Sequence, residues 1–365
     1  MKRVYLDYNA TSRLNLKVKK SIIQLMRAPL NPSSLHQEGS QAYKILEDSR
    51  KLIQKKLSVL GSHKLIFTSS CTEANNLVLR NFCTHVKFCS QFEHSSVKSL
   101  VQSNDIIITQ DGIIDLRELE ALLKNNRGKM LVSIMYVNNE IGSVQPINKI
   151  TSLVQQYDCL LHCDMTQAIG KIPVFIKNID IITLSTHKIG GPVGAAVFLI
   201  KNHLSIQPLT IGGGQEFGLR SGTHNILAIQ GMKTVFLHIQ DIITSFCRLS
   251  GLRDYFESAL QNITQAVIIA AEHIARIPNT SSIYMPNVSA ETQLIFFDMN
   301  GFAVSIGAAC SSGKVNVSSA HLAIRIKPEV AQNFIRISLG PECTKLEIDQ
   351  FLRCWRILYC LNNYK

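Results

Sequence analysis

The sequence predicts an α/β protein with a large domain, built on a mostly parallel sheet with helices on both faces, and a smaller α+β domain. Two observations carry this prediction. Short apolar runs alternate with longer amphipathic segments over residues 64–200, a pattern typical of strands joined by helices in such a sheet. Beyond about residue 264, further strand patterns and a final helical pattern indicate a second unit. We expect the large domain over 15–240 and the small domain over 1–14 and 241–365.

The elements are expected in the following order. Residues 4–11 form an extended segment that ends in a polar turn. Helices are expected over 16–27, 40–60, 115–124 and 147–157, a mostly helical bridge over 225–262, and a last helix over 345–361. Strands are expected at 65–67, from 86 towards His94, and at 105–109, 130–137, 159–167, 180–188, 193–200, 267–270, 281–285 and 303–306.

Composition excludes several classes of protein. With 365 residues, 46% hydrophobic content and 18% charged residues, the chain can bury a large core and is not disordered. The net charge of +12 is scattered along the chain, so an acidic partner would be attracted but direct nucleic-acid recognition is not expected. No Cys-x-x-Cys pair occurs among the ten cysteines, so no metal site is expected. Without a signal-peptide core or a membrane-length apolar stretch, we expect a cytoplasmic protein and no membrane contact.

Polar and ionisable side chains stand where the predicted strands end. In open α/β sheets ligands bind at the C-terminal ends of the strands, so these side chains are expected to lie close together. They are Thr72, His94, Asn139, Asp164, Gln167, Ser185, His187 and Lys188. A structural role explains one or two such residues but not eight, so we predict a cofactor pocket.

Lys188 directly follows a buried strand, where an ammonium must be paired, lose its charge or be consumed in a covalent bond. A Schiff base with pyridoxal phosphate is the third outcome, and an exposed loop lysine is the alternative. The helix that starts near Thr72 could bind a phosphate at its N-terminus, or could simply be capped by Ser70 or Thr72. The glycine-rich loop 212–223 is either flexible or an anion-binding nest.

Ten stretches, in order and almost from end to end, resemble the cysteine desulfurases of the class V aminotransferase family, pyridoxal-phosphate enzymes that take sulfur from cysteine. The stretches are Tyr5-Leu-Asp-Tyr-Asn-Ala-Thr11, Phe67-Thr-Ser-Ser-Cys-Thr-Glu-Ala-Asn-Asn76, Glu93-His94, Asn138-Asn-Glu-Ile-Gly142, His162-Cys-Asp-Met-Thr-Gln167, Ser185-Thr-His-Lys188, Gly212-Gly-Gly-Gln-Glu216, Arg220-Ser-Gly-Thr223, Gly307-Ala-Ala-Cys310 and Arg336-Ile-Ser-Leu-Gly340. The resemblance implies the type I fold of pyridoxal-phosphate transferases, with a seven-stranded sheet in the large domain, and the long-loop group of the family.

The resemblance also implies a role for each site residue. Lys188 would bind the cofactor through its amine and then take a proton from the substrate α-carbon, while Asp164 would pair with the protonated pyridine nitrogen. His94 would stack on the ring and assist proton transfer. The remaining roles would be a hydrogen bond to the ring oxygen from Gln167, phosphate binding by Thr72, Ser185 and His187, and a contact of Thr223 with the phosphate in the other subunit of a homodimer. Asn139 and Arg336 would hold the carboxylate of L-cysteine.

Cys310 would be the nucleophile that takes sulfur from the bound cysteine, giving an enzyme persulfide and L-alanine. Its small and polar neighbours indicate an exposed, mobile loop over about 307–320, suited to passing sulfur to an acceptor such as an iron–sulfur scaffold protein, or towards tRNA thiolation. An inert core cysteine is the alternative.

Four positions depart from the family pattern: Ser70, Cys71, Val193 and Phe217. Ser70 and Cys71 replace small residues before the phosphate threonine, and Val193 and Phe217 replace cations, which weakens expectations about loop pairing and partner contacts. Two alternatives therefore stay open beside a full desulfurase. One is a selenocysteine lyase or another class V enzyme, and the other is a weakly active paralogue that acts as a sulfur-trafficking partner.

Overall fold

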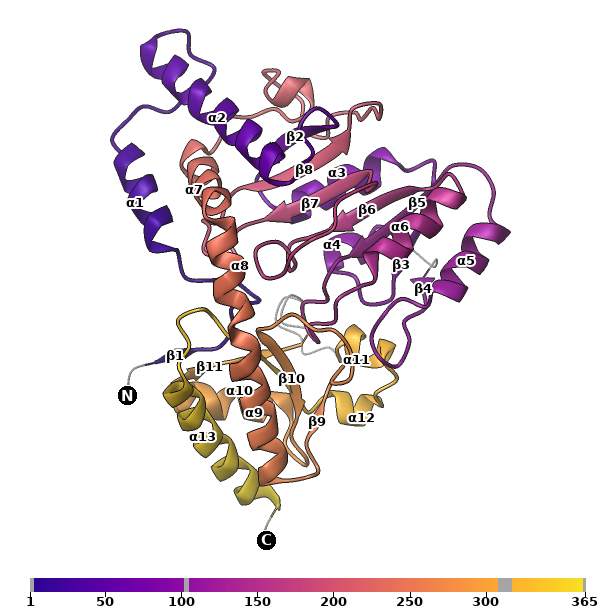
Figure 1. Ribbon diagram of the computed structural model, residues 1–365, viewed down its shortest axis with the longest axis vertical. Coiled ribbons are helices and arrows are strands. Elements are labelled where there is room, and N and C mark those ends of the chain that lie inside the picture. Colours follow the sequence, from indigo (N-terminus) through magenta and orange to yellow (C-terminus); the bar gives the residue numbers. More distant parts are fainter. Residues whose placement is uncertain (1–2, 102–104, 308–316, 364–365) are drawn as a thin grey trace.

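A seven-stranded sheet forms the larger part of the molecule in a computed structural model that describes residues 3–101, 105–307 and 317–363 (Figure 1). The strand order is β2-β8-β7-β6-β5-β3-β4, and only β8 runs antiparallel to its neighbours. The strands are β2 (His63–Thr68), β3 (Val86–Ser90), β4 (Asp105–Ile106), β5 (Met130–Met135), β6 (Leu160–Asp164), β7 (Ile181–Ser185) and β8 (Ala196–Lys201). The predicted fold class, with a mostly parallel seven-stranded sheet, is confirmed.

The central strands are apolar because helices cover both faces of this sheet. All residues of β5 and β7 are buried, as expected for strands without a solvent face. Successive side chains point to opposite faces, so Leu131 of β5 packs in the cluster under α3 and α4, whereas Val132 packs in the main core with α2 and α6. Figure 1 shows α2, α6 and α7 on the near face of the sheet and α3 on the far face.

The helices of this part are α1 (Leu16–Leu25), α2 (Gln37–Lys56), α3 (Cys71–Asn81), α4 (Ser95–Lys98), α5 (Leu116–Asn125), α6 (Ile147–Gln156) and α7 (Ile226–Leu237), and the chain continues through α8 (Ile239–Cys247) and α9 (Leu249–Ile263). The bridge expected over 225–262 is therefore three helices, interrupted at His238 and Arg248. Helix α2 begins earlier than expected, because the His36 side chain caps it by accepting a hydrogen bond from Gly39 N.

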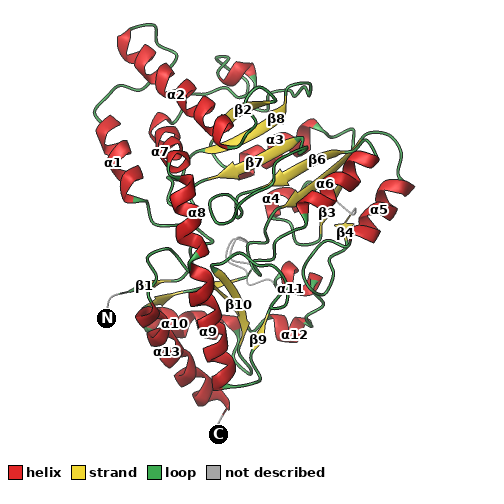
Figure 2. Cartoon of the chain, in the orientation of Figure 1, coloured by secondary structure: helices red, strands yellow, loops and turns green. Residues whose placement is uncertain are grey.

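A second, antiparallel sheet lies at the opposite end of the long axis, with the order β12-β13-β10-β9 (Figure 2). Its strands are β9 (Ile268–Ile269), β10 (Thr280–Tyr284), β12 (Ser305–Ile306) and β13 (Phe334–Ser338). The neighbouring helices are α10 (Ala290–Met299), α11 (Ser319–Ala323), α12 (Pro328–Ala331) and α13 (Lys345–Asn363). Strand β13 and helices α10 to α12 are elements that the sequence analysis did not predict.

The N-terminal segment connects the two sheets. Strand β1 (Val4–Tyr5) pairs in parallel with β11 (Phe302–Ala303). The chain then bridges to Ser338 of β13 through Asp7, and Ser12 N donates to His187 O, just beyond β7, at 2.8 Å. The first residues of the chain therefore pass between the sheets.

Within the described residues, no single helix is long and apolar enough to cross a membrane. One bent pair, α7 with the α8–α9 stretch, meets the length and composition of a span but turns by 66° at its break.

Candidate active site

A cavity of about 300 Å³ lies between the two sheets, at the C-terminal ends of the parallel strands. Its lining includes eight of the predicted site residues: Thr72, His94, Asn139, Asp164, Gln167, His187, Lys188 and Arg336. Asn9, Cys71, Asn75, Ser96, Thr166 and Gly307 also line it. The cavity thus combines side chains from the N-terminal segment, the large sheet and β13.

Asp164, at the end of β6, is the anionic group of the cavity. Its Oδ1 accepts from Thr166 N at 2.9 Å and its Oδ2 from Asn75 Nδ2 at 3.0 Å. Burial raises the pKa of this carboxyl, but the hydrogen bonds from Thr166 and Asn75 outweigh burial and lower it overall. Asp164 is therefore ionised at neutral pH and can hold a cationic ring nitrogen.

His94 is held from behind by its own turn. Its Nδ1 lies 3.1 Å from Ser96 N and 2.8 Å from Ser96 Oγ, within the N-terminal cap of α4. Burial and Lys188 lower the pKa of His94, although Asp164 opposes this shift. The imidazole is therefore neutral at pH 7, and its Nε2 is the ring nitrogen that remains for a molecule in the cavity.

The N-terminus of α3 and the end of β7 lie at one end of the cavity. Ser70 caps α3 by accepting from Glu73 N at 3.2 Å, so the hydroxyl of Thr72 is not the cap and faces the cavity from an exposed position. Ser185 is buried, and its Oγ makes no hydrogen bond to a nitrogen or oxygen of the described residues, although it interacts with the weak thiol of Cys71. A buried hydroxyl without a strong partner, next to free helical N–H groups, fits a phosphate.

Cys71 itself is an inert thiol. Its Sγ lies 2.9 Å from Thr166 Oγ1, and burial together with the charge of Asp164 raises its pKa well above the usual range. His187 lies at the same end of the cavity, and burial with the neighbouring charge of Lys188 lowers its pKa to about 4. Both side chains are neutral at pH 7.

Gln167 is anchored by two groups that the sequence analysis did not single out. Its Nε2 donates to Asn9 O at 3.0 Å, and its Oε1 accepts from Lys171 Nζ at 2.7 Å. Lys171 is fully buried and also donates to Asn9 Oδ1 at 2.7 Å. Burial and the charges of Lys188 and Arg336 hold the pKa of Lys171 well below its usual range. The four-residue spacing of Gln167 and Lys171 was visible in the sequence, but the contact with Asn9 was not.

Arg336 lies at the end of the cavity formed by the second sheet. Its Nη2 pairs with Asp7 Oδ1 at 2.7 Å and its Nη1 donates to Asn139 O at 3.0 Å. The Nε of Arg336 is buried and has no hydrogen-bond partner among the described residues. Asn139 and Arg336 thus contact one another, and an acceptor in the cavity could satisfy the remaining donor. The part played by Asp7 was missed, because its partner is more than three hundred residues away.

Three predicted residues are not among those that line the cavity, and Ser185, buried at the end of β7, is the first of them. Thr223 is exposed on the glycine-rich loop and does not line it. Cys310 lies outside the described residues, although Gly307, three residues before it, does line the cavity.

The glycine-rich loop is anchored by a buried carboxylate. Glu216 is 5% exposed and receives hydrogen bonds from Arg50 Nη1 at 2.8 Å, Arg50 Nη2 at 2.9 Å, Phe67 N at 2.8 Å and His224 Nε2 at 2.7 Å. Phe217, where the family has a cation, adopts a left-handed backbone with φ of 61°, and Arg50 stacks 4.8 Å from its ring centroid. The loop is therefore not simply flexible at Glu216, where an ion pair with Arg50 of α2 and a hydrogen bond from Phe67 N of β2 anchor it.

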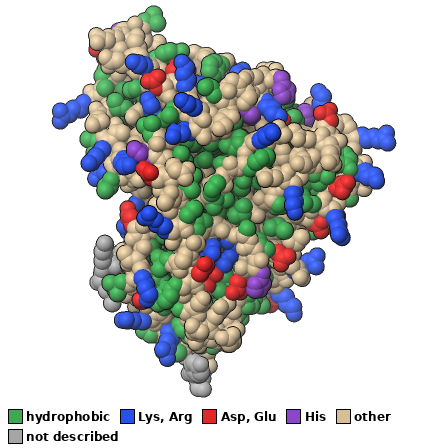
Figure 3. Space-filling model, in the orientation of Figure 1, with side chains coloured by type: hydrophobic (Ala, Val, Ile, Leu, Met, Phe, Trp, Pro, Cys, Tyr) green, Lys and Arg blue, Asp and Glu red, His purple; other side chains and the backbone are tan. Residues whose placement is uncertain are grey.

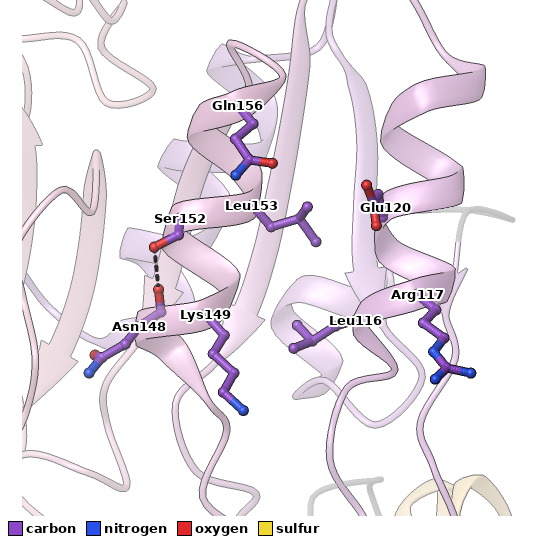
Figure 4. A pocket seen from close by; sticks show the side chains of 8 residues that line it. All are labelled: Leu116, Arg117, Glu120, Asn148, Lys149, Ser152, Leu153 and Gln156. Atoms are coloured by element: carbon purple, nitrogen blue, oxygen red, sulfur yellow. Dashed lines mark hydrogen bonds between the residues drawn. The ribbon is translucent and has the colours of Figure 1, made fainter.

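Two other hollows are open to solvent. One lies between α5 and α6, where the side chains of Leu116 and Leu153 point into the gap between the two helices (Figure 4). The other, of about 710 Å³, is lined mainly by apolar side chains of segment 172–178 and of α7 and α8, and hydrophobic side chains gather on this face in Figure 3. The described residues include no group of three His, Cys, Asp or Glu side chains arranged to bind a metal.

Comparison with known proteins gives consistent results. A model of the aminotransferase class-V family matches residues 4–351. The chain is 33% identical over 371 residues to the cysteine desulfurase IscS of Dictyoglomus turgidum, covering 96% of this chain and 93% of that protein. Among solved structures, a NifS-like protein from Rickettsia africae has a TM-score of 0.91 and 36% identity, covering 98% of this chain and 99% of the other. A protein described as SspA in complex with cysteine has a TM-score of 0.79 and 25% identity, covering 93% and 100%.

Proposed function

The chain belongs to the cysteine desulfurases of the class V aminotransferase family, and on this premise we propose that the cavity between its two sheets binds pyridoxal phosphate and L-cysteine. One observation carries the proposal. Side chains from the N-terminal segment, from five strand ends of the large sheet and from β13 line a single cavity, and they include an ionised carboxylate, a lysine and an arginine. The solved relative in complex with cysteine supports the choice of substrate.

The donor set fits the cofactor. Thr72, His187, the N-terminus of α3 and the unsatisfied Ser185 hydroxyl would hold the phosphate, and Asp164 would hold the proton on the ring nitrogen. Gln167 would face the ring oxygen with His94 stacked on the ring. When bound, pyridoxal phosphate supplies an aldehyde for the amine of cysteine and a ring that withdraws electrons from its α-carbon.

The protein's own residues would then act in turn. Arg336 and Asn139 would orient the substrate carboxylate, and Lys188 Nζ would take the proton from the α-carbon and later return it. The thiolate of Cys310 would attack the substrate sulfur, so that a sulfur–sulfur bond forms as the carbon–sulfur bond breaks. The products are a persulfide on Cys310 and L-alanine.

We further propose a homodimer in which Thr223, exposed on its anchored loop, reaches the phosphate in the other subunit. Delivery of the persulfide sulfur to an acceptor such as an iron–sulfur scaffold protein would complete the cycle. A reducing, cytoplasmic compartment suits a reaction that depends on a thiolate.

Alanine release from L-cysteine by purified protein loaded with pyridoxal phosphate tests the proposal. Lys188→Ala should abolish both alanine release and the visible absorbance of the bound cofactor, whereas Lys201→Ala, a lysine on β8 that pairs with Asp180 at 2.7 Å outside the cavity, should change neither. Cys310→Ser should keep the absorbance and lose the persulfide, with exposed Cys247→Ser as its control. Loaded protein that releases no alanine from cysteine would exclude the desulfurase.

A further inference from the structure

We propose that Asn75 is a positioning residue whose side-chain amide ties the Asp164 carboxylate to the His94 imidazole and sets the direction of a buried chain of hydrogen bonds behind the cavity. The proposal rests on the proposed function, in which these two side chains serve the cofactor. Asn75 lies in the second turn of α3 and has 0% exposure. No role is given to it by the family resemblance stated above.

Both the nitrogen and the oxygen of the Asn75 side-chain amide form hydrogen bonds. Its Nδ2 donates to Asp164 Oδ2 at 3.0 Å and to Ser96 Oγ at 2.9 Å, and its Oδ1 accepts from Thr183 Oγ1 at 2.6 Å. Ser96 in turn contacts His94 Nδ1. The Asn75 amide and the Ser96 hydroxyl therefore link the carboxylate of Asp164 to the imidazole of His94.

Asp164 fixes how this amide is turned. An ionised carboxylate only accepts hydrogen bonds, and the hydrogen bonds to Asp164 keep its pKa low. Nδ2 must therefore face Asp164, because a flipped amide would set two oxygens against one another. With Oδ1 then turned to Thr183, the threonine hydroxyl must be the donor.

The same order of donors and acceptors continues along the hydrogen bonds that lead away from the cavity. The Thr183 hydroxyl donates its only hydrogen to Asn75. Its oxygen must therefore accept a hydrogen bond from His162 Nε2, which lies 3.0 Å away. Burial lowers the pKa of His162, so the ring is neutral and carries one hydrogen. That hydrogen is on Nε2, and Nδ1 accepts from Ser133 Oγ at 2.8 Å. The ionised carboxylate of Asp164 therefore determines the tautomer of the fully buried His162.

The donors and acceptors of the hydrogen bonds that lead towards the cavity are also determined. The Ser96 hydroxyl accepts from Asn75 and is free to donate to His94 Nδ1 at 2.8 Å, and the backbone N–H of Ser96 donates to the same atom at 3.1 Å. Nδ1 is therefore an acceptor, and the hydrogen of the neutral His94 ring is on Nε2. His94 consequently presents a donor, not an acceptor, to a molecule in the cavity.

The first test needs no cofactor and is read on the unaltered protein, with variants used only to assign the signals. Protein labelled with ¹⁵N-histidine should show two-bond ¹⁵N–¹H correlations of the Nε2–H tautomer for His94 and His162, assigned by loss of each signal in His94→Gln and His162→Gln. Either ring in the Nδ1–H tautomer would overturn the proposal. Because this readout is independent of turnover, correct tautomers in a protein that releases no alanine would refute the proposed function alone.

The second test uses Asn75→Asp, which keeps the acceptor for Thr183 and removes the donor to Ser96, while the new carboxyl shares one proton with Asp164. The Ser96 hydroxyl is then free to turn to the new carboxylate, so the His94 Nδ1 signal should shift, and pyridoxal phosphate should bind about tenfold to a hundredfold more weakly. Gln293→Leu is the matched control, since it removes a fully buried amide bonded to Val288 O and Asn333 O, away from the cavity. It should destabilise the fold but leave both readouts unchanged.

The conservative pair at Thr183 separates positioning from simple packing. Thr183→Ser keeps the hydroxyl and should preserve the His162 spectrum, whereas Thr183→Val should shift it while keeping the shape of the side chain. An unchanged His94 signal and cofactor affinity in Asn75→Asp, or an unchanged His162 signal in Thr183→Val, would refute the proposal. If Asn75→Asp does not fold, the Thr183 pair and the tautomers of the unaltered protein still decide the matter.

Discussion

Replacing Glu216 by glutamine should destabilise the protein strongly, because the side chain is the only acid that pairs with both Nη atoms of Arg50 in the described structure. Arg50 and Glu216 side chains are 7% and 1% exposed. Breaking a buried ion pair by removing one partner costs about 3–5 kcal/mol. Glu47 still contacts Arg50 Nε at 3.1 Å, and the new amide can accept from Phe67 N, so we expect about 3 kcal/mol, the lower end of that range.

The assay is equilibrium unfolding in urea, with three related variants. Glu47→Gln removes a 24% exposed partner of the same arginine and should cost at most about 1 kcal/mol. The double variant Arg50→Met with Glu216→Gln removes the buried cation that the single change leaves unpaired, so it should cost less than the sum of the two single changes. A Glu216→Gln protein no less stable than Glu47→Gln would refute the reasoning.

The same pair predicts a pH dependence. Burial raises the pKa of Glu216, but the hydrogen bonds from Arg50 and His224 outweigh it and lower the pKa below that of an unfolded glutamate. The stabilisation is therefore present above about pH 4.3, the unfolded value, and is lost as the pH falls through the lower folded value. The difference in unfolding free energy between wild type and Glu216→Gln should shrink in acid.

Three further predictions concern single side chains. Burial raises the pKa of Glu93 to about 8. Its contribution to stability therefore declines as the pH rises from about 4.3, the pKa of an unfolded glutamate, through 8. In urea unfolding, Glu93→Gln should flatten this decline. Cys71 should escape iodoacetamide at pH 8 while exposed Cys83 and Cys247 are alkylated, as peptide mass spectrometry would reveal; rapid labelling of Cys71 would contradict its raised pKa. Lys171→Met should release Gln167 and shift the absorbance maximum of the bound cofactor, and an unaltered spectrum would contradict the anchoring role.

The sequence could predict the large sheet and most of the cavity lining for a local reason. Each strand is a short apolar run, and the polar residue that follows it must reach the same edge of the sheet, so Asp164 and Lys188 could be found from position alone. The resemblance added Arg336, which no local pattern marks. The sequence did not reveal contacts between residues that are far apart in the chain. Asn75 looks like an ordinary polar residue of α3, and its partners Asp164 and Ser96 come from other elements.

Some elements left no clear pattern. Helix α10 carries the run Leu294 to Phe297, with apolar residues on several faces, so it lacks the periodicity of a single buried stripe. The breaks at His238 and Arg248 contain neither proline nor glycine, the residues that usually signal a helix end in sequence. The direction of β8 is set by its pairing with β7, and an apolar run reads the same whichever way its strand points.

The position of the N-terminal segment has a consequence for biosynthesis. Asp7 pairs with Arg336, and Asn9 N bonds to Ser338 Oγ, so these contacts await the synthesis of 329 further residues. A ribosome that has released the large sheet still holds the residues that complete the cavity. Contacts of such long sequence separation form late, so ligand binding should begin only after β13 has left the ribosome.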